Sequence, residues 1–333
     1  MFRWVAFAAL LAAALAGCRT ASSSPARNAT TQALRTATVA AQTASAGCSP
    51  ARPHASGDSN GTLQSGGLER TYILHVPAGY DGSKPAPVVL VFHGFTLNAD
   101  FMSAYAKIPQ AADKDGFIAL LPNGTGQPQY WNSSAAVGGP DDAGFIRDLL
   151  AKVQSDLCVD PTRIYAAGYS NGGGMAQFVA CELEPQIAAV AVVASTYGSC
   201  QPTVPVVAFH GTADPLLPFD GSDTSLGVVG GNLPPVRKAL SEWAAALGCD
   251  RLPTISRPGA NVELSTFRHC ITGDGEALLY AVLGGGHTWP GGAFPIDALG
   301  QTTNEIDATQ IMWQFFAAHP KAHTAAPGLT PAG

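Results

Sequence analysis

The sequence predicts an α/β fold in which a mostly parallel central sheet carries helices on both faces. Short, fully apolar runs alternate along the chain with longer stretches of helical spacing. Such runs are typical of strands buried on both faces, and their alternation with helices favours parallel pairing. The 333 residues are 46% hydrophobic, which is enough for a large core, and no internal repeat or second-domain boundary is visible. The charged fraction is 13% with a net charge of −6 and no basic patch, so a nucleic-acid partner is not expected.

The positions of the individual strands and helices are predicted from the spacing of their apolar residues and from the residues that begin them. The run 88–92 is wholly apolar, the segment 235–247 opens on a proline, and 305–318 has an amphipathic pattern. Strands are expected at 71–76, 88–92, 117–121, 163–168, 187–194, 204–209, 262–267 and 277–283. Helices are expected at 100–112, 142–157, 171–180, 235–247 and 305–318.

The first 17 residues have the pattern of a signal peptide, because a short positive start precedes an apolar run too short to span a bilayer comfortably. The run ends in Leu-Ala-Gly-Cys, which resembles a bacterial lipobox with Cys18 as the lipidated residue. An ordinary secretory signal cleaved near Ala16 is the alternative. We expect an exported protein, lipid-anchored at the cell envelope or else secreted. Residues 18–60 are expected to be a flexible linker, 61–320 the folded domain, and 321–333 a disordered tail.

Cysteine parity agrees with export. Removal of Cys18 leaves six cysteines, which an exported chain can join in three disulfides. Local spacing favours Cys181–Cys200 and Cys249–Cys270, and Cys48–Cys158 then remains by elimination, although fifteen pairings are formally possible. No CxxC pair or histidine cluster has zinc-like spacing, so we expect no metal site and no cofactor.

A candidate nucleophile lies in Gly168-Tyr169-Ser170-Asn171-Gly172, a G-x-S-x-G pentapeptide. A β-prone run precedes it and helical spacing follows it, so Ser170 is expected at a tight strand-to-helix corner. The flanking glycines are then required because side chains there would collide with the neighbouring strand and helix. The corner also directs the first helical N–H groups toward the atom that Ser170 attacks.

Ser170 needs a base and an orienting carboxylate, which we seek in loops after later strands. Asp214 follows the predicted strand 204–209, and His287 follows the strand 277–283 after three glycines that allow a sharp bend. A turn-capping role is the alternative for Asp214. The order Ser170, Asp214, His287 is the chain order of the α/β-hydrolase fold.

The oxyanion formed during acyl transfer needs two donors. We expect the backbone N–H of Asn171 and that of Phe95, in the loop after the strand 88–92, with Thr96 as second choice. Three aromatic residues near these loops are candidates for substrate binding: Trp131, Trp289 and Tyr169. For Trp131 a role in shielding the core is an equal alternative.

Several motifs together resemble the polyhydroxybutyrate depolymerase and feruloyl esterase family. They run in order from Leu90-Val91-Phe92-His93-Gly94 through Leu121-Pro122-Asn123-Gly124, Asp142-Ala143-Gly144-Phe145-Ile146, the Ser170 pentapeptide and His210-Gly211-Thr212-Ala213-Asp214 to Gly286-His287-Thr288-Trp289-Pro290-Gly291. The resemblance covers about residues 66–320 and implies an extracellular α/β-hydrolase that cleaves carboxylic esters through an acyl-enzyme. Ala143 stands where the family pattern leads us to expect Val.

The sequence thus predicts a monomeric serine esterase with Ser170, His287 and Asp214 as nucleophile, base and orienting acid. Feruloyl or acetyl esters of plant polysaccharide are the expected substrates, and polyhydroxyalkanoate oligomers or polyesters are the alternative. Two other classes remain: a peptidase on the same fold, and a carbohydrate-binding surface protein with a vestigial triad.

Overall fold

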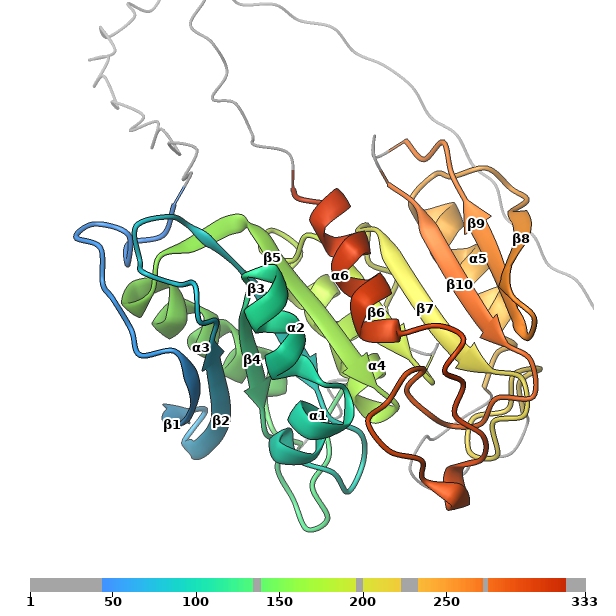
Figure 1. The fold of residues 1–333 in the computed structure, drawn as a ribbon, viewed down its shortest axis with the longest axis horizontal. Helices are drawn as coiled ribbons and strands as arrows, with labels where there is room; N and C mark the ends of the chain where they lie inside the picture. The colour runs from blue at the N-terminus through green and yellow to red at the C-terminus, as the bar shows by residue number, and fades with distance from the viewer. Residues whose placement is uncertain (1–43, 134–138, 196–199, 223–232, 272–274, 322–333) are drawn as a thin grey trace, which may run out of the picture. The chain divides into compact units, whose positions relative to one another are not determined.

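Ten strands form one sheet in the computed structural model, which describes residues 44–133, 139–195, 200–222, 233–271 and 275–321 (Figure 1). The six central strands pair in parallel, which confirms the predicted α/β class. Antiparallel strands extend the sheet at both edges. The order across the sheet is β1 (Gly57–Ser65), β2 (Leu68–Val76), β4 (Ile118–Pro122), β3 (Ala86–Phe92), β5 (Val159–Tyr169), β6 (Val190–Val193), β7 (Val206–Gly211), β10 (Ala277–Val282), β9 (Val262–Phe267) and β8 (Thr254–Gly259).

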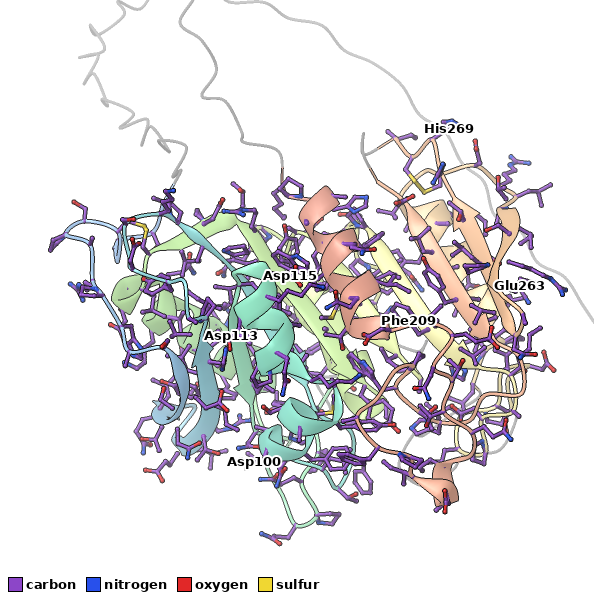
Figure 2. All side chains as sticks on the ribbon, in the orientation of Figure 1. Asp100, Asp113, Asp115, Phe209, Glu263 and His269 are labelled. Atoms are coloured by element: carbon purple, nitrogen blue, oxygen red, sulfur yellow. A yellow bond between two sulfur atoms is a disulfide. The ribbon has the colours of Figure 1, made fainter. Side chains whose placement is uncertain are left out.

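Two hydrophobic cores lie on opposite faces of this sheet. Alternate residues of β3 divide between them, with Val88 and Leu90 in one core and Val89 and Val91 in the other, as the two-residue period of a strand requires. Phe209 of β7 lies beside α6 (Figure 2). Helices α3 (Asp142–Asp156), α4 (Asn171–Glu182) and α5 (Val236–Ala246) cover the first core, and α1 (Ala99–Tyr105), α2 (Ile108–Asp115) and α6 (Ala308–Ala318) cover the second.

Three local expectations differ from the structure. The linker expected up to residue 60 was wrong at its end, because residues 57–65 form β1 and pair along their whole length with β2. Strand β8 was also missed, since both edge strands are largely exposed and lack an apolar pattern. The single helix expected over 100–112 is two helices, because Lys107 adopts φ +52° and Pro109 opens the second one.

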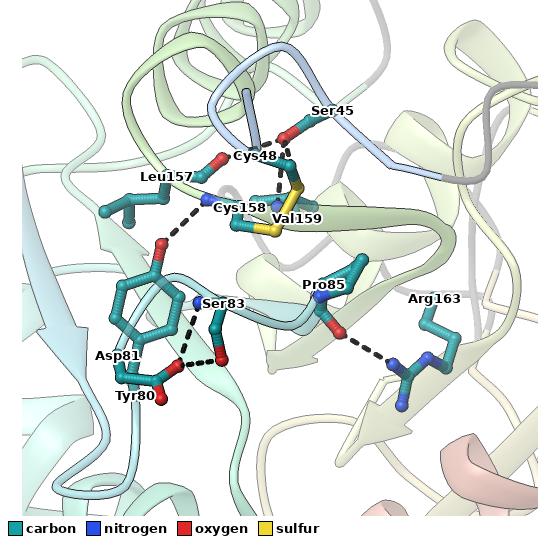
Figure 3. Close-up of a disulfide and its surroundings, with 10 residues drawn as sticks. All are labelled: Ser45, Cys48, Tyr80, Asp81, Ser83, Pro85, Leu157, Cys158, Val159 and Arg163. Atoms are coloured by element: carbon teal, nitrogen blue, oxygen red, sulfur yellow. Dashed lines mark hydrogen bonds between the residues drawn. A yellow bond between two sulfur atoms is a disulfide. The ribbon is translucent and has the colours of Figure 1, made fainter. Parts of the chain in front are cut away.

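The structure pairs the six cysteines as spacing and elimination favoured, in Cys48–Cys158, Cys181–Cys200 and Cys249–Cys270. Figure 3 shows the first of them at the start of β5, where Ser45 Oγ donates to the Leu157 carbonyl and accepts from the Val159 N–H. Disulfides persist in oxidising compartments, and three of them agree with an exported protein.

Loss of the Cys48–Cys158 bond should cost more stability than loss of Cys249–Cys270. The first closes a separation of 110 residues and the second one of 21. Chain entropy then predicts losses of about 5 and about 3 kcal/mol in the free energy of unfolding for the paired alanine variants. Urea titration under non-reducing conditions measures both values, and equal or inverted losses would contradict the loop-closure argument.

The signal peptide, Cys18 and most of the predicted linker and tail lie outside the described residues. Among the helices that the structure does describe, none has the length and apolar character needed to cross a bilayer.

Candidate active site

The predicted catalytic residues gather at the carboxyl-terminal edge of the parallel strands. Ser170 follows β5, Asp214 lies three residues after β7, and His287 lies five residues after β10. The loop that starts at His93 follows β3, the direct neighbour of β5. Four sheet strands therefore deliver these segments to one edge, which is where open α/β sheets place their ligands.

Ser170 occupies the sharp corner that its pentapeptide predicts. Its backbone adopts φ +55° and ψ −123°, a conformation rare for a residue with a side chain. A Cβ on Gly168 would lie 1.9 Å from the Gly172 carbonyl oxygen, and one on Gly172 would lie 2.3 Å from that of Phe92. Both glycines are required by close backbone approach, and the N–H of Gly173 closes the turn onto the Ser170 carbonyl at 2.8 Å.

Asp214 and His287 form a buried hydrogen-bonded pair. The Nδ1 of His287 lies 2.7 Å from the Asp214 Oδ2, and the two side chains are 3% and 0% exposed. The other carboxylate oxygen of Asp214 accepts the N–H groups of Leu216 and Leu217, each at 2.8 Å. Since a carboxylate only accepts, Nδ1 carries the proton and Nε2 of His287 is left as the basic nitrogen.

The backbone of His287 is held as firmly as its ring. Its N–H donates to the Leu299 carbonyl at 2.7 Å, and its carbonyl accepts the Tyr169 hydroxyl at 2.5 Å. Burial raises the pKa of that hydroxyl, so Tyr169 stays protonated and donates. Tyr169, the residue before Ser170, therefore links the corner at Ser170 to the loop that carries His287.

His210 is the other histidine near Asp214. Its Nε2 lies 3.8 Å from the Asp214 Oδ2, which is beyond hydrogen-bond distance, and its Nδ1 is 3.1 Å from the Gly211 carbonyl. Burial lowers the pKa of this imidazole. His210 is accordingly a buried, neutral side chain next to Asp214, and the hydrogen bond of Asp214 goes to His287 instead.

The loop after β3 carries Phe95 and Thr96, the two alternatives for one expected oxyanion donor. The N–H of Thr96 donates to the Gln129 carbonyl at 2.8 Å, so the second-choice assignment of Thr96 was wrong. In the described part of the chain, the N–H groups of Phe95 and Asn171 have no hydrogen-bond acceptor. Two unpaired amides thus remain at the residues that the sequence indicates.

His93 holds this loop in shape. Its Nε2 accepts the Gly124 N–H at 2.9 Å, and its Nδ1–H donates to the Gly94 carbonyl at 2.8 Å. Burial lowers the pKa of His93 to about 4, so the ring is neutral at neutral pH and keeps both bonds. His93 therefore ties the loop after β3 to the loop that follows β4.

The predicted contact of Trp289 with substrate was wrong, and of the two alternatives for Trp131 the structure agrees with the role in the core. The side chains of Trp131 and Trp289 are 2% and 1% exposed, so neither offers a ring face to a ligand. The indole N–H of Trp131 donates to the His93 carbonyl, and that of Trp289 donates to the Thr309 hydroxyl. Tyr169 is equally buried, at 2% exposure, so its assignment as a substrate contact was also wrong. All three side chains belong to the hydrophobic cores of the domain.

The side chain of Asn171 has a function that the sequence did not suggest. Its Oδ1 accepts the Trp131 N–H at 2.7 Å and its Nδ2 donates to the Trp131 carbonyl at 3.1 Å. The side-chain amide therefore acts as a two-bond clamp on the loop after β4. This clamp keeps Asn171 oriented at the first turn of α4, where its backbone N–H is unpaired.

Arg70 and Asp142 form a buried ion pair that no local pattern indicated. Their side chains are 2% and 0% exposed, and Arg70 Nη2 lies 2.7 Å from the Asp142 Oδ1. The other carboxylate oxygen accepts the Asn132 N–H at 2.7 Å, and Arg70 also donates to the Asn123 carbonyl. Burial raises the pKa of Asp142 and Arg70 opposes the shift. The pair fixes both ends of the loop that His93 and Asn171 bind.

Breaking this pair should destabilise the protein strongly. Arg70→Met leaves a buried, unpaired carboxylate, which costs about 3–5 kcal/mol in the free energy of unfolding. In an Asp142→Asn background the same change should cost about half as much or less, because Asn still accepts the Asn132 N–H and carries no charge. A double-mutant cycle by urea denaturation measures the coupling, and additive losses would show that the charges do not interact.

Within the described segments, no group of three or more His, Cys, Asp or Glu side chains could hold a metal ion. The groups that the described residues bring to this edge are a hydroxyl, an imidazole–carboxylate pair and two backbone amides without an acceptor. This combination is typical of acyl transfer through a serine nucleophile.

Comparison with solved structures defines the class of the fold. The acetyl xylan esterase from Aspergillus awamori superposes over 78% of this chain and 99% of its own, with a TM-score of 0.55 and 16% sequence identity. At that identity the likeness concerns the fold alone, which is that of the α/β-hydrolases.

Sequence comparison then identifies the family. The family model described as Esterase PHB depolymerase matches residues 70–217. The protein named "Putative esterase NocK" of Nocardia uniformis subsp. tsuyamanensis is 34% identical over 69% of this chain and 73% of its own length. Feruloyl esterase B of Piromyces equi is 33% identical over 66% of this chain, which spans 42% of that longer protein. The chain belongs to the esterase PHB depolymerase family, a family of carboxylic-ester hydrolases.

Proposed function

We propose that the protein is an exported serine esterase that cleaves feruloyl or acetyl esters of plant polysaccharide. The observation that carries the proposal is the buried bond between His287 Nδ1 and the Asp214 carboxylate, at the same sheet edge as Ser170. This bond selects the tautomer in which Nε2 of His287 takes a proton. Two unpaired amides at that edge support the same reaction.

In the proposed mechanism Ser170 Oγ attacks the ester carbonyl while His287 Nε2 takes the hydroxyl proton. The N–H groups of Phe95 and Asn171 hold the oxyanion of the tetrahedral intermediate. The intermediate collapses to an acyl-serine as the protonated His287 transfers its proton to the leaving alcohol. Water then attacks the acyl group and loses a proton to His287. As the bond between the acyl carbon and Ser170 Oγ breaks, His287 returns this proton to Oγ, and the acid and the free enzyme are released. Asp214 stabilises the imidazolium in both halves of the reaction.

The substrate class rests on the relatives. A relative named feruloyl esterase B and a fold neighbour named acetyl xylan esterase support polysaccharide esters. The description of the family model includes PHB (polyhydroxybutyrate) depolymerase, so polyhydroxyalkanoate oligomers are the second candidate substrate. Attachment through a lipidated Cys18 and a monomeric state belong to the proposal as well.

A substrate panel with an active-site probe tests the function. Turnover of methyl ferulate, acetylated xylan and hydroxybutyrate oligomers is compared, and a fluorophosphonate probe is mapped by peptide mass spectrometry. We expect labelling at Ser170 and the highest kcat/KM on the ferulate or acetyl ester. Preference for the oligomers would favour the second candidate. Turnover of a peptide anilide with no ester cleavage, or failure of the probe to label Ser170, would refute the esterase.

A further inference from the structure

An exposed phenylalanine lies in the segment that follows His287. Phe294 follows His287 by seven residues and is 39% exposed. Its ring packs edge-on against Phe101 of α1, with centroids 5.8 Å apart, and at a tilt against Tyr105, at 5.2 Å. Phe294 also lines a surface pocket of about 470 Å³. We call Phe101, Tyr105 and Phe294 the aromatic cluster.

A chain of ring contacts connects this cluster to the catalytic residues. The Tyr105 ring packs against the Tyr169 ring at 6.0 Å, and the Tyr169 ring packs against His287 at 5.2 Å. The Tyr105 carbonyl also accepts the Ala293 N–H at 2.9 Å. Phe294, the exposed member of the cluster, is therefore connected to His287 through three ring contacts.

Polar side chains with unused hydrogen-bonding capacity adjoin the cluster. Asn304 lines both the Phe294 pocket and a neighbouring pocket of about 550 Å³, which Gln301 also lines. In the part of the chain that the structure describes, the side-chain amides of Gln301 and Asn304 have no hydrogen-bond partner. The backbone of Gln301 and Leu299 accepts the N–H groups of Gly286 and His287, so this polar segment lies against the loop of the base.

The charged residues of the two pockets have different partners. Lys107, in the Phe294 pocket, has its Nζ 3.5 Å from the Asp307 Oδ2, whereas Glu305, in the neighbouring pocket, accepts N–H groups of the neutral Asn261 and keeps its negative charge. The Phe294 pocket therefore offers an aromatic face and a neutral amide, and its lysine is already paired with an aspartate. A ligand that suits it is neutral, has an apolar face for stacking, and carries hydroxyl groups for the amides.

A sugar ring has these properties, and an esterase acting on polysaccharide releases an alcohol that is itself a sugar. We propose that the exposed ring of Phe294, held in place by Phe101 and the buried Tyr105, forms with Gln301 and Asn304 a subsite for a neutral sugar residue of the alcohol part of the ester. This inference rests on the proposed function, and it adds recognition of the carbohydrate chain to the cleavage at Ser170.

Substrates with one acyl group and two different alcohols test the subsite. The kcat/KM for a feruloylated arabinoxylo-oligosaccharide is divided by that for methyl ferulate in each variant. We expect Phe294→Ala to lower this ratio about 5- to 10-fold, and Phe294→Trp to restore most of it, because stacking depends on the ring face. Leu68→Ala is the matched control, since Leu68 is 44% exposed at the turn between β1 and β2 and should leave the ratio unchanged.

Binding without turnover provides an independent readout. Ester-free xylo-oligosaccharide is titrated against the Ser170→Ala protein, with and without Phe294→Ala, and followed by tryptophan fluorescence and calorimetry. We expect saturable binding that weakens when Phe294 is removed.

Three results separate the hypotheses. An unchanged ratio in Phe294→Ala overturns the subsite while esterase activity stands. If Phe294→Ala lowers kcat/KM equally on methyl ferulate and on the oligosaccharide ester, the sugar subsite is also overturned, because the pocket would then bind the acyl group that the two substrates share. Absence of cleavage of every ester by the unaltered protein refutes the proposed function itself.

Discussion

Replacing Ser170 with alanine should lower kcat on p-nitrophenyl esters by a factor of about 10⁴–10⁶ while the protein remains folded. The loss follows from removal of the attacking oxygen, without which His287 and the two amides have no covalent step to assist. Folding should survive because the substitution keeps the Cβ, and the corner is held by backbone bonds from Ser170 N–H to the Val193 carbonyl and from Gly173 N–H to the Ser170 carbonyl. Initial rates and thermal unfolding measure the two quantities.

Ser195→Ala is the matched control for this variant. Ser195 is fully buried and lies close to Gly173, since a Cβ added to Gly173 would lie 2.7 Å from the Ser195 Cβ. Its hydroxyl has no hydrogen-bond partner among the described residues. Removing this hydroxyl should leave kcat unchanged. Retention of near-normal turnover in Ser170→Ala would remove Ser170 from the mechanism.

Asp214→Asn should lower kcat by about 10⁴ through a change of tautomer. Asp214 Oδ1 accepts two backbone N–H groups, from Leu216 and Leu217, so the carbonyl oxygen of an asparagine would take that position. Its NH₂ group would then face Nδ1 of His287, where Oδ2 lies at 2.7 Å in the native pair. An NH₂ group donates, so Nδ1 would have to accept and the proton would move to Nε2. His287 could no longer accept the proton of Ser170.

Two measurements follow this change. The kcat on p-nitrophenyl acetate gives the loss, and ¹⁵N chemical shifts of the imidazole report which nitrogen carries the proton. Asp220→Asn is the control. Asp220 is exposed in the segment after Asp214, so this substitution makes the same chemical change in a side chain that does not contact His287. A protonated Nδ1 in Asp214→Asn, or a loss below tenfold, would contradict this assignment of roles.

The nucleophile corner was predictable because its cause is local. Gly168 and Gly172 are needed where one strand turns into one helix, and the collisions that exclude other residues involve neighbours in sequence or the adjacent strand. The positions of Asp214 and His287 were predictable for a related reason, since parallel strands place their carboxyl ends at one edge. The break between α1 and α2 also had a local signal in Pro109, which the apolar period concealed.

Burial was not predictable at the level of single side chains. Trp131 and Trp289 follow strands in loops near the site, where an aromatic residue equally fits a ligand wall or a core. Helices and loops from other parts of the chain decide between these roles, since Trp289 donates to Thr309 and Trp131 to His93. The pairing of Arg70 with Asp142, 72 residues away, likewise has no local trace.

By itself the sequence determined the α/β class, the sharp corner at Ser170 and the placement of Ser170, Asp214 and His287 after strands of the sheet. These features depend on hydrophobic period and on backbone space, which short segments carry. Only the tertiary structure decided that the Thr96 N–H donates to the Gln129 carbonyl. It also decided that Trp131 and Trp289 are buried and that Phe294 is exposed. The physical reason is that exposure and hydrogen-bond partners depend on which distant segments pack together, and no local stretch of sequence specifies them.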